Sequence, residues 1–202
     1  AVAVRHRCGA RWFRCGSEVD ASDLGSDLER VLLTEEQLLT RLDEMAAKID
    51  VDYAGKNVLL VGVLKGALMV MADLSRALHI DVETDWMAVS SYGSGTKSSG
   101  VVRILKDLDR DVTDRHVLVV EDIIDSGLTL SWLIANLRAR GAASVEVCTM
   151  LRKPEAAKVE VDVRYVGFDI PDEFVVGYGL DHAERYRNLR VVGTLAHHVY
   201  GS

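Results

Sequence analysis

The hydrophobic positions after residue 30 follow two different periods, which together predict alternating helices and strands. The capping box Thr34-Glu35-Glu36-Gln37 begins a helix, and Leu38, Leu42, Met45 and Ile49 then fall on one helical face. The uninterrupted apolar run of residues 58–64 is typical of a strand buried on both faces. Similar patterns predict helices over 67–78 and 129–140, and strands over 80–90, 101–105, 117–120, 145–151 and 163–168.

This order of elements predicts the fold class. Two strand–loop–helix–strand units favour an α/β fold with a central, mostly parallel sheet flanked by helices. In such folds, ligands bind at the carboxyl ends of the strands. The segment SYGSGTKSSG, residues 91–100, is small and polar apart from Tyr92, so we expect a flexible loop there.

Residues 1–30 differ from the rest of the chain. They open with a basic stretch and turn acidic after Glu18, without the continuous apolar core of a secretory signal. We expect residues 1–30 to be a disordered tail or an upstream extension, and residues 31–202 to form one domain.

Composition excludes several classes of protein. The chain has 202 residues, 49% of them hydrophobic and 27% charged, which is ordinary globular usage. A net charge of −7 gives no overall attraction to nucleic acid, and no apolar run is long enough to predict a membrane span. The scattered Cys8, Cys15 and Cys148 predict neither disulfides nor a zinc site, and they favour a reducing, cytoplasmic location.

The strongest chemical signal lies after residue 120. Glu121 and Asp122 follow a buried strand, and the segment DSGLT, residues 125–129, then enters a helix. Neighbouring carboxylates repel each other, so the pair indicates a cation or a polyhydroxyl ligand. Free amides, two hydroxyls and the helix dipole suit a phosphate monoester. An ordinary Asp/Ser helix cap would explain one of these residues but not the set.

The run VLVVEDIIDSGLT resembles the phosphoribosyl-pyrophosphate signature of purine phosphoribosyltransferases. Three further segments are similar to the hypoxanthine-guanine branch of that family: Leu64-Lys65-Gly66, Ser91-Tyr92 and FVVGYGLDHAERYR at residues 174–187. The resemblance extends from about residue 31 to the C-terminus. It implies the type I phosphoribosyltransferase fold, with a small hood from the terminal segments and a flexible lid loop that includes Ser91 and Tyr92.

The resemblance also implies roles for the donor-binding residues. Glu121 and Asp122 would hold the ribose hydroxyls and Mg²⁺, and Asp181 would bind a second Mg²⁺. Asp125 would be the general base at purine N7. The 5-phosphate would bind at Ser126, Gly127, Leu128 and Thr129, and pyrophosphate at Lys65, Gly66 and Arg187, often beside a cis peptide that precedes the lysine. Without the resemblance, Lys65, Asp181 and Arg187 could be ordinary surface charges.

The base-binding residues follow from the same resemblance. Phe174 would stack on the purine, the Val175 backbone would read the edge of the base, and Lys153 would donate to the 6-oxygen. Ile123 and Asp181 complete this purine-binding set. In isolation, Phe174 would be interpreted as a core aromatic.

The resemblance implies a Mg²⁺-dependent purine salvage enzyme that makes IMP or GMP from phosphoribosyl pyrophosphate and hypoxanthine or guanine, assembled as a homodimer or homotetramer. The alternative is a regulatory protein that binds the same donor on the same fold and controls nucleic acid. A regulator predicts an added DNA-binding module or a basic face, and this acidic chain has neither pattern. A P-loop NTPase is excluded because no G-x-x-x-x-G-K-[ST] motif occurs.

Overall fold

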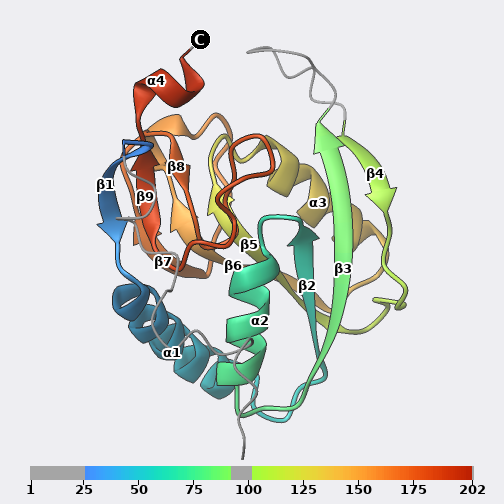
Figure 1. Cartoon of the computed structure of the whole chain (residues 1–202). Helices are drawn as coiled ribbons and strands as arrows, with labels where there is room; N and C mark the ends of the chain where they lie inside the picture. Colours follow the sequence, from blue (N-terminus) through green and yellow to red (C-terminus); the bar gives the residue numbers. More distant parts are fainter. Residues whose placement is uncertain (1–25, 92–101, 202) are drawn as a thin grey trace, which may run out of the picture.

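A computed structural model describes residues 26–91 and 102–201. Its main body is a six-stranded sheet in the order β4-β3-β2-β5-β6-β7, and all neighbouring pairs are parallel except the antiparallel pair β3 and β4 (Figure 1). The predicted α/β architecture is therefore confirmed. The strands are β2 (Val58–Leu64), β3 (Val82–Ser91), β4 (Val102–Lys106), β5 (His116–Ile124), β6 (Ser144–Arg152) and β7 (Tyr165–Asp169).

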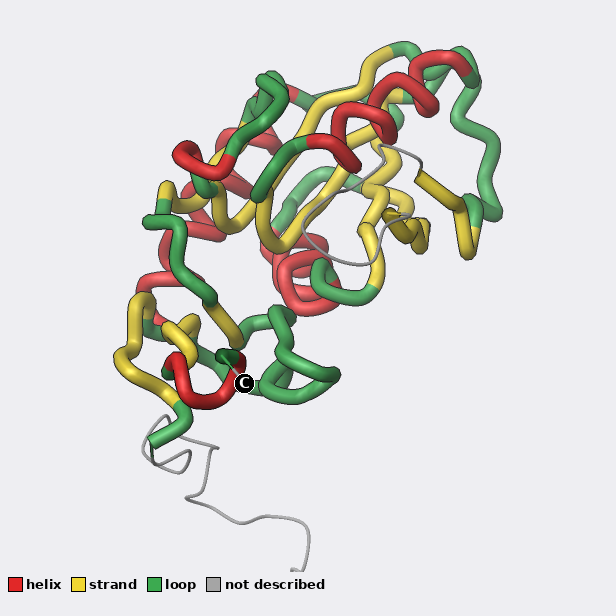
Figure 2. Tube along the Cα trace, turned by 90° about the horizontal axis from the view of Figure 1, so that it is seen from above, coloured by secondary structure: helices red, strands yellow, loops and turns green. Residues whose placement is uncertain are grey.

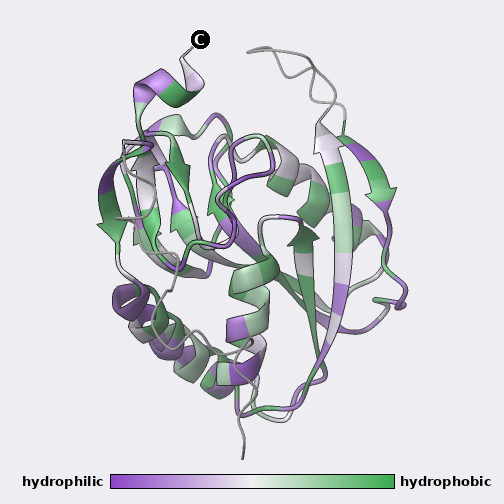
Figure 3. Ribbon diagram, viewed as in Figure 1, coloured by the Kyte–Doolittle hydropathy of each residue, from purple (hydrophilic) through white to green (hydrophobic). Residues whose placement is uncertain are grey.

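Helices cover both faces of this sheet because alternate strand residues point to opposite sides. Leu60 on β2 and Leu118 on β5 join the core under α1 (Glu35–Asp52) and α2 (Leu68–Ala77). Their neighbours Leu59 and Val119 join a second core under α3 (Leu128–Ala139). Figure 3 shows β2 as hydrophobic along most of its length, whereas α1 mixes hydrophilic and hydrophobic positions. The uninterrupted apolar run of β2 thus reflects burial on both faces.

Local signals fix the start of α1 and the length of β5. The Thr34 hydroxyl accepts from the Gln37 amide, and the Gln37 side chain accepts from the Thr34 amide, so the predicted capping box is present. The strand expected over 117–120 is longer than predicted, since β5 continues to Ile124. Its backbone stays paired because β6 extends alongside it, with Ile124 opposite Arg152. The carboxylates Glu121 and Asp122 therefore lie within the strand rather than beyond it.

The topology determines where loops converge. From β2 the chain moves to β3 on one side of the sheet, and from β5 it moves to β6 and β7 on the other side. The order reverses between the adjacent strands β2 and β5, and such a switch point opens a crevice at the carboxyl ends of the strands. The loops after these two strands carry Lys65 and Asp125.

A second, three-stranded antiparallel sheet joins distant parts of the chain in the order β1-β9-β8. Figure 2, which views the molecule from above, shows it to one side of the main sheet. It corresponds to the hood that the resemblance implies. Its first strand begins at Leu28, three residues before the boundary expected at residue 31. The remaining elements are β1 (Leu28–Leu33), β8 (Val175–Val176), β9 (Val192–Leu195), the 3-10 helix η2 (Pro154–Ala156) and α4 (His197–Tyr200).

Candidate functional site

Two adjacent carboxylates lie in the last part of β5. Glu121 is buried, with 9% of its surface exposed. Burial raises the pKa of Glu121 well above its ordinary value, and repulsion from Asp122 adds to this increase. Burial also raises the pKa of Asp122 to about 6, against the lowering effects of backbone hydrogen bonds and of Arg187. Ionised side chains in this position require a counter-charge or strong hydrogen-bond donors.

The turn after β5 leads directly into the N-terminus of α3. Gly127 is the N-cap residue and has a φ of 76°, a left-handed conformation that favours glycine. No side chain caps this helix, so the alternative interpretation of the motif as an ordinary Asp/Ser cap is wrong. The first-turn amides lack intrahelical partners and are available to an anion. A cavity of about 150 Å³ opens here, lined by Glu121, Ile123, Ile124, Asp125, Ser126, Gly127, Thr129 and Leu130.

The loop after β2 lies against the carboxylate pair. The peptide bond between Leu64 and Lys65 is cis, as the resemblance implies. A Cβ atom on Gly66 would lie 1.8 Å from Asp122 Oδ2, and a Cβ on Gly179 would lie 2.1 Å from the Gly66 carbonyl oxygen. Only glycines allow the three segments to approach this closely.

Arg187 connects this loop to the segment after β8. Its guanidinium donates to the Gly179 carbonyl at 2.8 Å and forms a 2.7 Å ion pair with Asp181. The Nε atom is buried and makes no hydrogen bond within the described residues. A buried donor without a partner costs about 1–3 kcal/mol, so this arginine retains a donor that an anionic ligand can use.

The residues expected to bind the purine lie in a different part of the site. Lys153 is buried, with 8% of its surface exposed, and its ammonium lies 3.3 Å from Asp172 Oδ1. Phe174 is 38% exposed, so it is not a core aromatic. Its ring stacks on Tyr200 of α4, with centroids 4.8 Å apart and planes 18° apart. Val175 lies in β8, paired with Thr194 of β9.

Most of the sequence-predicted residues therefore converge on one region. Glu121, Asp122, Lys65, Gly66, Asp181 and Arg187 form a connected group, beside the cavity that Asp125, Ser126, Gly127 and Thr129 line. Leu128 does not line this cavity and is the first residue of α3. Lys153 joins this region through its backbone amide, which donates to the Ile124 carbonyl at 2.9 Å. Ser91 is the last residue of β3 and pairs with Val102, whereas Tyr92 lies outside the described residues.

Three residues of this region were given no role from the sequence. Asp172 contacts Lys153, and Glu184 lies 3.1 Å from the Lys65 ammonium. Tyr200 covers one face of Phe174. Each acts through a tertiary contact, so no local pattern distinguishes it from an ordinary surface residue. Asp172 could have been singled out only by its place between Pro171 and the aromatic base candidate.

The donor set fits a divalent cation that is bound together with a ligand. Within residues 26–91 and 102–201, no three His, Cys, Asp or Glu side chains are arranged to hold a metal ion alone. Mg²⁺ commonly binds through one or two carboxylates and completes its coordination with substrate oxygens and water. Glu121 with Asp122, and separately Asp181, provide such incomplete sets of oxygen ligands.

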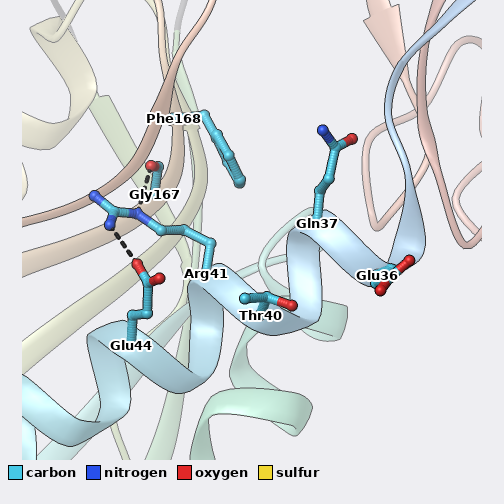
Figure 4. A pocket seen from close by; sticks show the side chains of 7 residues that line it. All are labelled: Glu36, Gln37, Thr40, Arg41, Glu44, Gly167 and Phe168. Carbon is cyan, nitrogen blue, oxygen red and sulfur yellow. Dashed lines mark hydrogen bonds and ion pairs between the residues drawn. The ribbon is translucent and has the colours of Figure 1, made fainter.

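A separate groove of about 480 Å³ runs along the outer side of α1, beside β7 (Figure 4). Arg41 crosses it and donates to the carbonyls of Gly167 and Val166, while also pairing with Glu44. These bonds tie α1 to β7, which is the edge strand of the main sheet. The groove is lined by none of the candidate site residues, and its polar contacts support the edge of the sheet.

Comparisons with known proteins agree with this arrangement. A family model described as "Phosphoribosyl transferase domain" matches residues 31–183. The chain is 56% identical over 180 residues to the hypoxanthine-guanine phosphoribosyltransferase of Mycobacterium tuberculosis, covering 86% of this chain and 89% of the relative. It is 50% identical over 177 residues to the enzyme of the same name from Streptococcus agalactiae, covering 88% and 98%. A solved hypoxanthine phosphoribosyltransferase from Staphylococcus aureus superposes with a TM-score of 0.87 at 44% identity, covering 92% of this chain and all of that one.

Proposed function

The chain belongs to the phosphoribosyl transferase family, and we propose that the residues gathered at its β2–β5 switch point carry out the reaction of the hypoxanthine-guanine branch. It is a purine salvage enzyme that transfers a phosphoribosyl group from its pyrophosphate donor to a 6-oxopurine, giving IMP or GMP. The comparisons give no support to the regulatory alternative. The observation that carries the proposal is the adjacent pair of carboxylates, buried Glu121 and partly buried Asp122, beside an uncapped helix N-terminus.

In the proposed reaction, Asp125 acts as the general base. The bond between ribose C1 and the pyrophosphate oxygen breaks, and its electron pair leaves with pyrophosphate. Purine N9 supplies the pair that forms the new bond to C1, and the N7 proton moves to the Asp125 carboxylate. Asp125 lines the cavity at the start of α3, and a positioned general base contributes about 10²–10⁴-fold to rate.

Charge neutralisation at the leaving group falls to Lys65 and Arg187. The negative charge on pyrophosphate grows as C1 becomes cation-like, and cations fixed in advance stabilise this change without reorganising. Arg187 is held by Gly179 and Asp181, so its position does not depend on the ligand. Enzymes of this family act with a divalent metal; Mg²⁺ at Glu121, Asp122 and Asp181 would supply further neutralisation of the donor.

Lys153 sets the choice of base in this proposal. An ammonium only donates hydrogen bonds, so it matches the 6-oxygen of hypoxanthine or guanine and mismatches the amino group of adenine. The buried position of Lys153 makes a mismatch expensive, because no water replaces the lost bond. Phe174 would stack on any purine, and the Val175 backbone would read the edge of the ring. Ile123 lies in the adjoining cavity lining.

Further expectations complete the proposal. A lid that includes Ser91 and Tyr92 would exclude water from C1, which would otherwise hydrolyse the donor. We expect a cytoplasmic enzyme that works as a homodimer or homotetramer, with small molecules rather than nucleic acid as ligands. Among the described residues, no helix is long and apolar enough to span a membrane.

The test is a direct assay of nucleotide formation. The protein is incubated with phosphoribosyl pyrophosphate and Mg²⁺, separately with hypoxanthine, guanine and adenine, and the nucleotides are measured. Formation of IMP and GMP with little AMP is expected. Binding of the donor without formation of any nucleotide would instead favour the regulatory alternative.

A further inference from the structure

The two cations that the proposed function assigns to pyrophosphate are paired with carboxylates of the same chain. Lys65 Nζ lies 3.1 Å from Glu184 Oε2. The Arg187 guanidinium lies 2.7 Å from Asp181 and 3.5 Å from Glu184. Glu184 is thus shared between both cations: it lies in the same segment as Arg187, residues 174–187, and reaches across to Lys65 in the loop after β2.

A tight turn holds Glu184 in this position. His182 and Arg185 form an isolated antiparallel bridge, joined by backbone hydrogen bonds of 3.2 and 3.0 Å. The two residues between them, Ala183 and Glu184, have φ values of 50° and 63°. Positive φ at both central positions is the requirement of a type I′ hairpin turn, where glycine and asparagine are usual. The Glu184 amide also donates to Asp181 at 2.9 Å, which ties the turn to the group expected to bind metal.

The Glu184 carboxylate and pyrophosphate are both negatively charged, so they compete for Lys65. Lys65 lowers the pKa of Glu184, so the ion pair favours its charged form. Pyrophosphate carries several negative charges, and a carboxylate that remains on Lys65 repels it. Binding therefore requires Lys65 to exchange the Glu184 oxygen for a pyrophosphate oxygen, and release allows the internal pair to form again.

We propose that Glu184 is an internal competitor of pyrophosphate: it pairs with Lys65 and contacts Arg187 before pyrophosphate binds, and it speeds release of the leaving group. This inference rests on the proposed function, because it takes Lys65 and Arg187 as the pyrophosphate-binding cations. The Lys65 and Glu184 side chains are about two-thirds exposed, at 65% and 64%. Exposed ion pairs are screened by solvent and individually weak, so the expected effect is a tuning of affinity rather than a switch.

The experiment measures binding of pyrophosphate in the presence of Mg²⁺ by titration calorimetry. Glu184→Gln keeps the shape of the side chain and removes its charge, and we expect it to lower the Kd for pyrophosphate about two- to five-fold. Glu36→Gln removes a charge from an exposed residue on α1 and should leave the Kd unchanged. In rapid-mixing experiments, pyrophosphate should also leave the Glu184→Gln enzyme more slowly.

A double-mutant cycle separates direct competition from a general change of charge. In a Lys65→Gln background, the Glu184→Gln substitution should improve affinity much less, because the contact it removes is already absent. An equal gain in both backgrounds would overturn the inference, as would an unchanged Kd in Glu184→Gln. If the wild-type protein binds no pyrophosphate with Mg²⁺, the proposed function fails at this site and the inference fails with it; wild-type binding with an unaffected variant overturns the inference alone.

Discussion

Replacing Gly66 by alanine tests whether the loop after β2 and the carboxylate pair form one site. The added Cβ would lie 1.8 Å from Asp122 Oδ2, so the carboxylate must move by about 1.6 Å to reach ordinary van der Waals contact, which begins near 3.4 Å. A short side chain can rotate away at moderate cost, and overpacking typically destabilises by about 1–3 kcal/mol. For a domain of this size we therefore expect Tm to fall by about 2–12 °C.

The effect on catalysis should be much larger than the effect on folding. A displacement of about 1 Å in a catalytic group can cost about 10²-fold in rate. Since Asp122 is expected to hold the ribose hydroxyls and the metal, kcat/KM for phosphoribosyl pyrophosphate should fall at least that far. The assay is initial-rate formation of IMP at varied donor concentration, with Tm measured on the same preparations.

A matched control lies four residues earlier in the chain. A Cβ on Gly62 would meet the Trp86 ring at 2.5 Å, so Gly62→Ala also overpacks the structure, but it does not touch Asp122. Gly62→Ala should lower Tm while largely keeping kcat/KM. A Gly66→Ala enzyme with near-normal kcat/KM, or a Gly62→Ala enzyme equally inactive, would refute the reasoning.

Other predictions address the general base Asp125 and the recognition of the purine. Asp125→Asn should lower kcat by about 10²-fold or more while donor Kd stays similar, because an amide cannot accept the N7 proton; near-normal turnover would remove Asp125 from this role. Wild-type kcat/KM for adenine should be at least about 10³-fold below that for hypoxanthine. Lys153→Ala should narrow this difference, mainly because kcat/KM for hypoxanthine falls. Equal use of both purines by the wild-type enzyme would contradict the role assigned to Lys153. Asp172→Asn should raise KM for hypoxanthine several-fold, since the 3.3 Å pair that positions Lys153 is weakened, whereas Asp169→Asn, which removes only the partner of Arg152, should not.

The main sheet was predictable from the sequence because its strands are buried on both faces. Leu59 and Leu60 pack into different hydrophobic cores on the two faces of the sheet. The run of residues 58–64 is therefore apolar throughout, without the alternation of apolar and polar residues that marks a half-exposed strand. The three-stranded sheet was not predictable from local pattern. Its first strand, residues 28–33, has a single buried residue, and β8 has only two residues. Both depend on pairing with β9, more than 150 residues after the first strand.

The candidate site divides in the same way. Asp125, Ser126 and Gly127 are contiguous, and their place before a helix could be inferred from the residues alone. The contacts of Asp172 and Glu184 could not, because each depends on where a distant cation lies in the fold. The motif residues could therefore be identified from the sequence, whereas the carboxylates that pair with Lys153 and Lys65 could not.

Val175 lies in the small sheet and Phe174 directly precedes its strand β8, which has a consequence for thermal inactivation. Within residues 26–91 and 102–201, β8 pairs with β9 alone, so the strand bearing Val175 is held by few backbone bonds. The cavity at the start of α3, by contrast, lies beside the large sheet. Small, weakly paired units can open at a free energy well below that of global unfolding. On heating, the enzyme should therefore lose purine binding while the six-stranded sheet is still folded. Amide hydrogen exchange in β8 and β9 should report this local opening at a temperature below that of global unfolding.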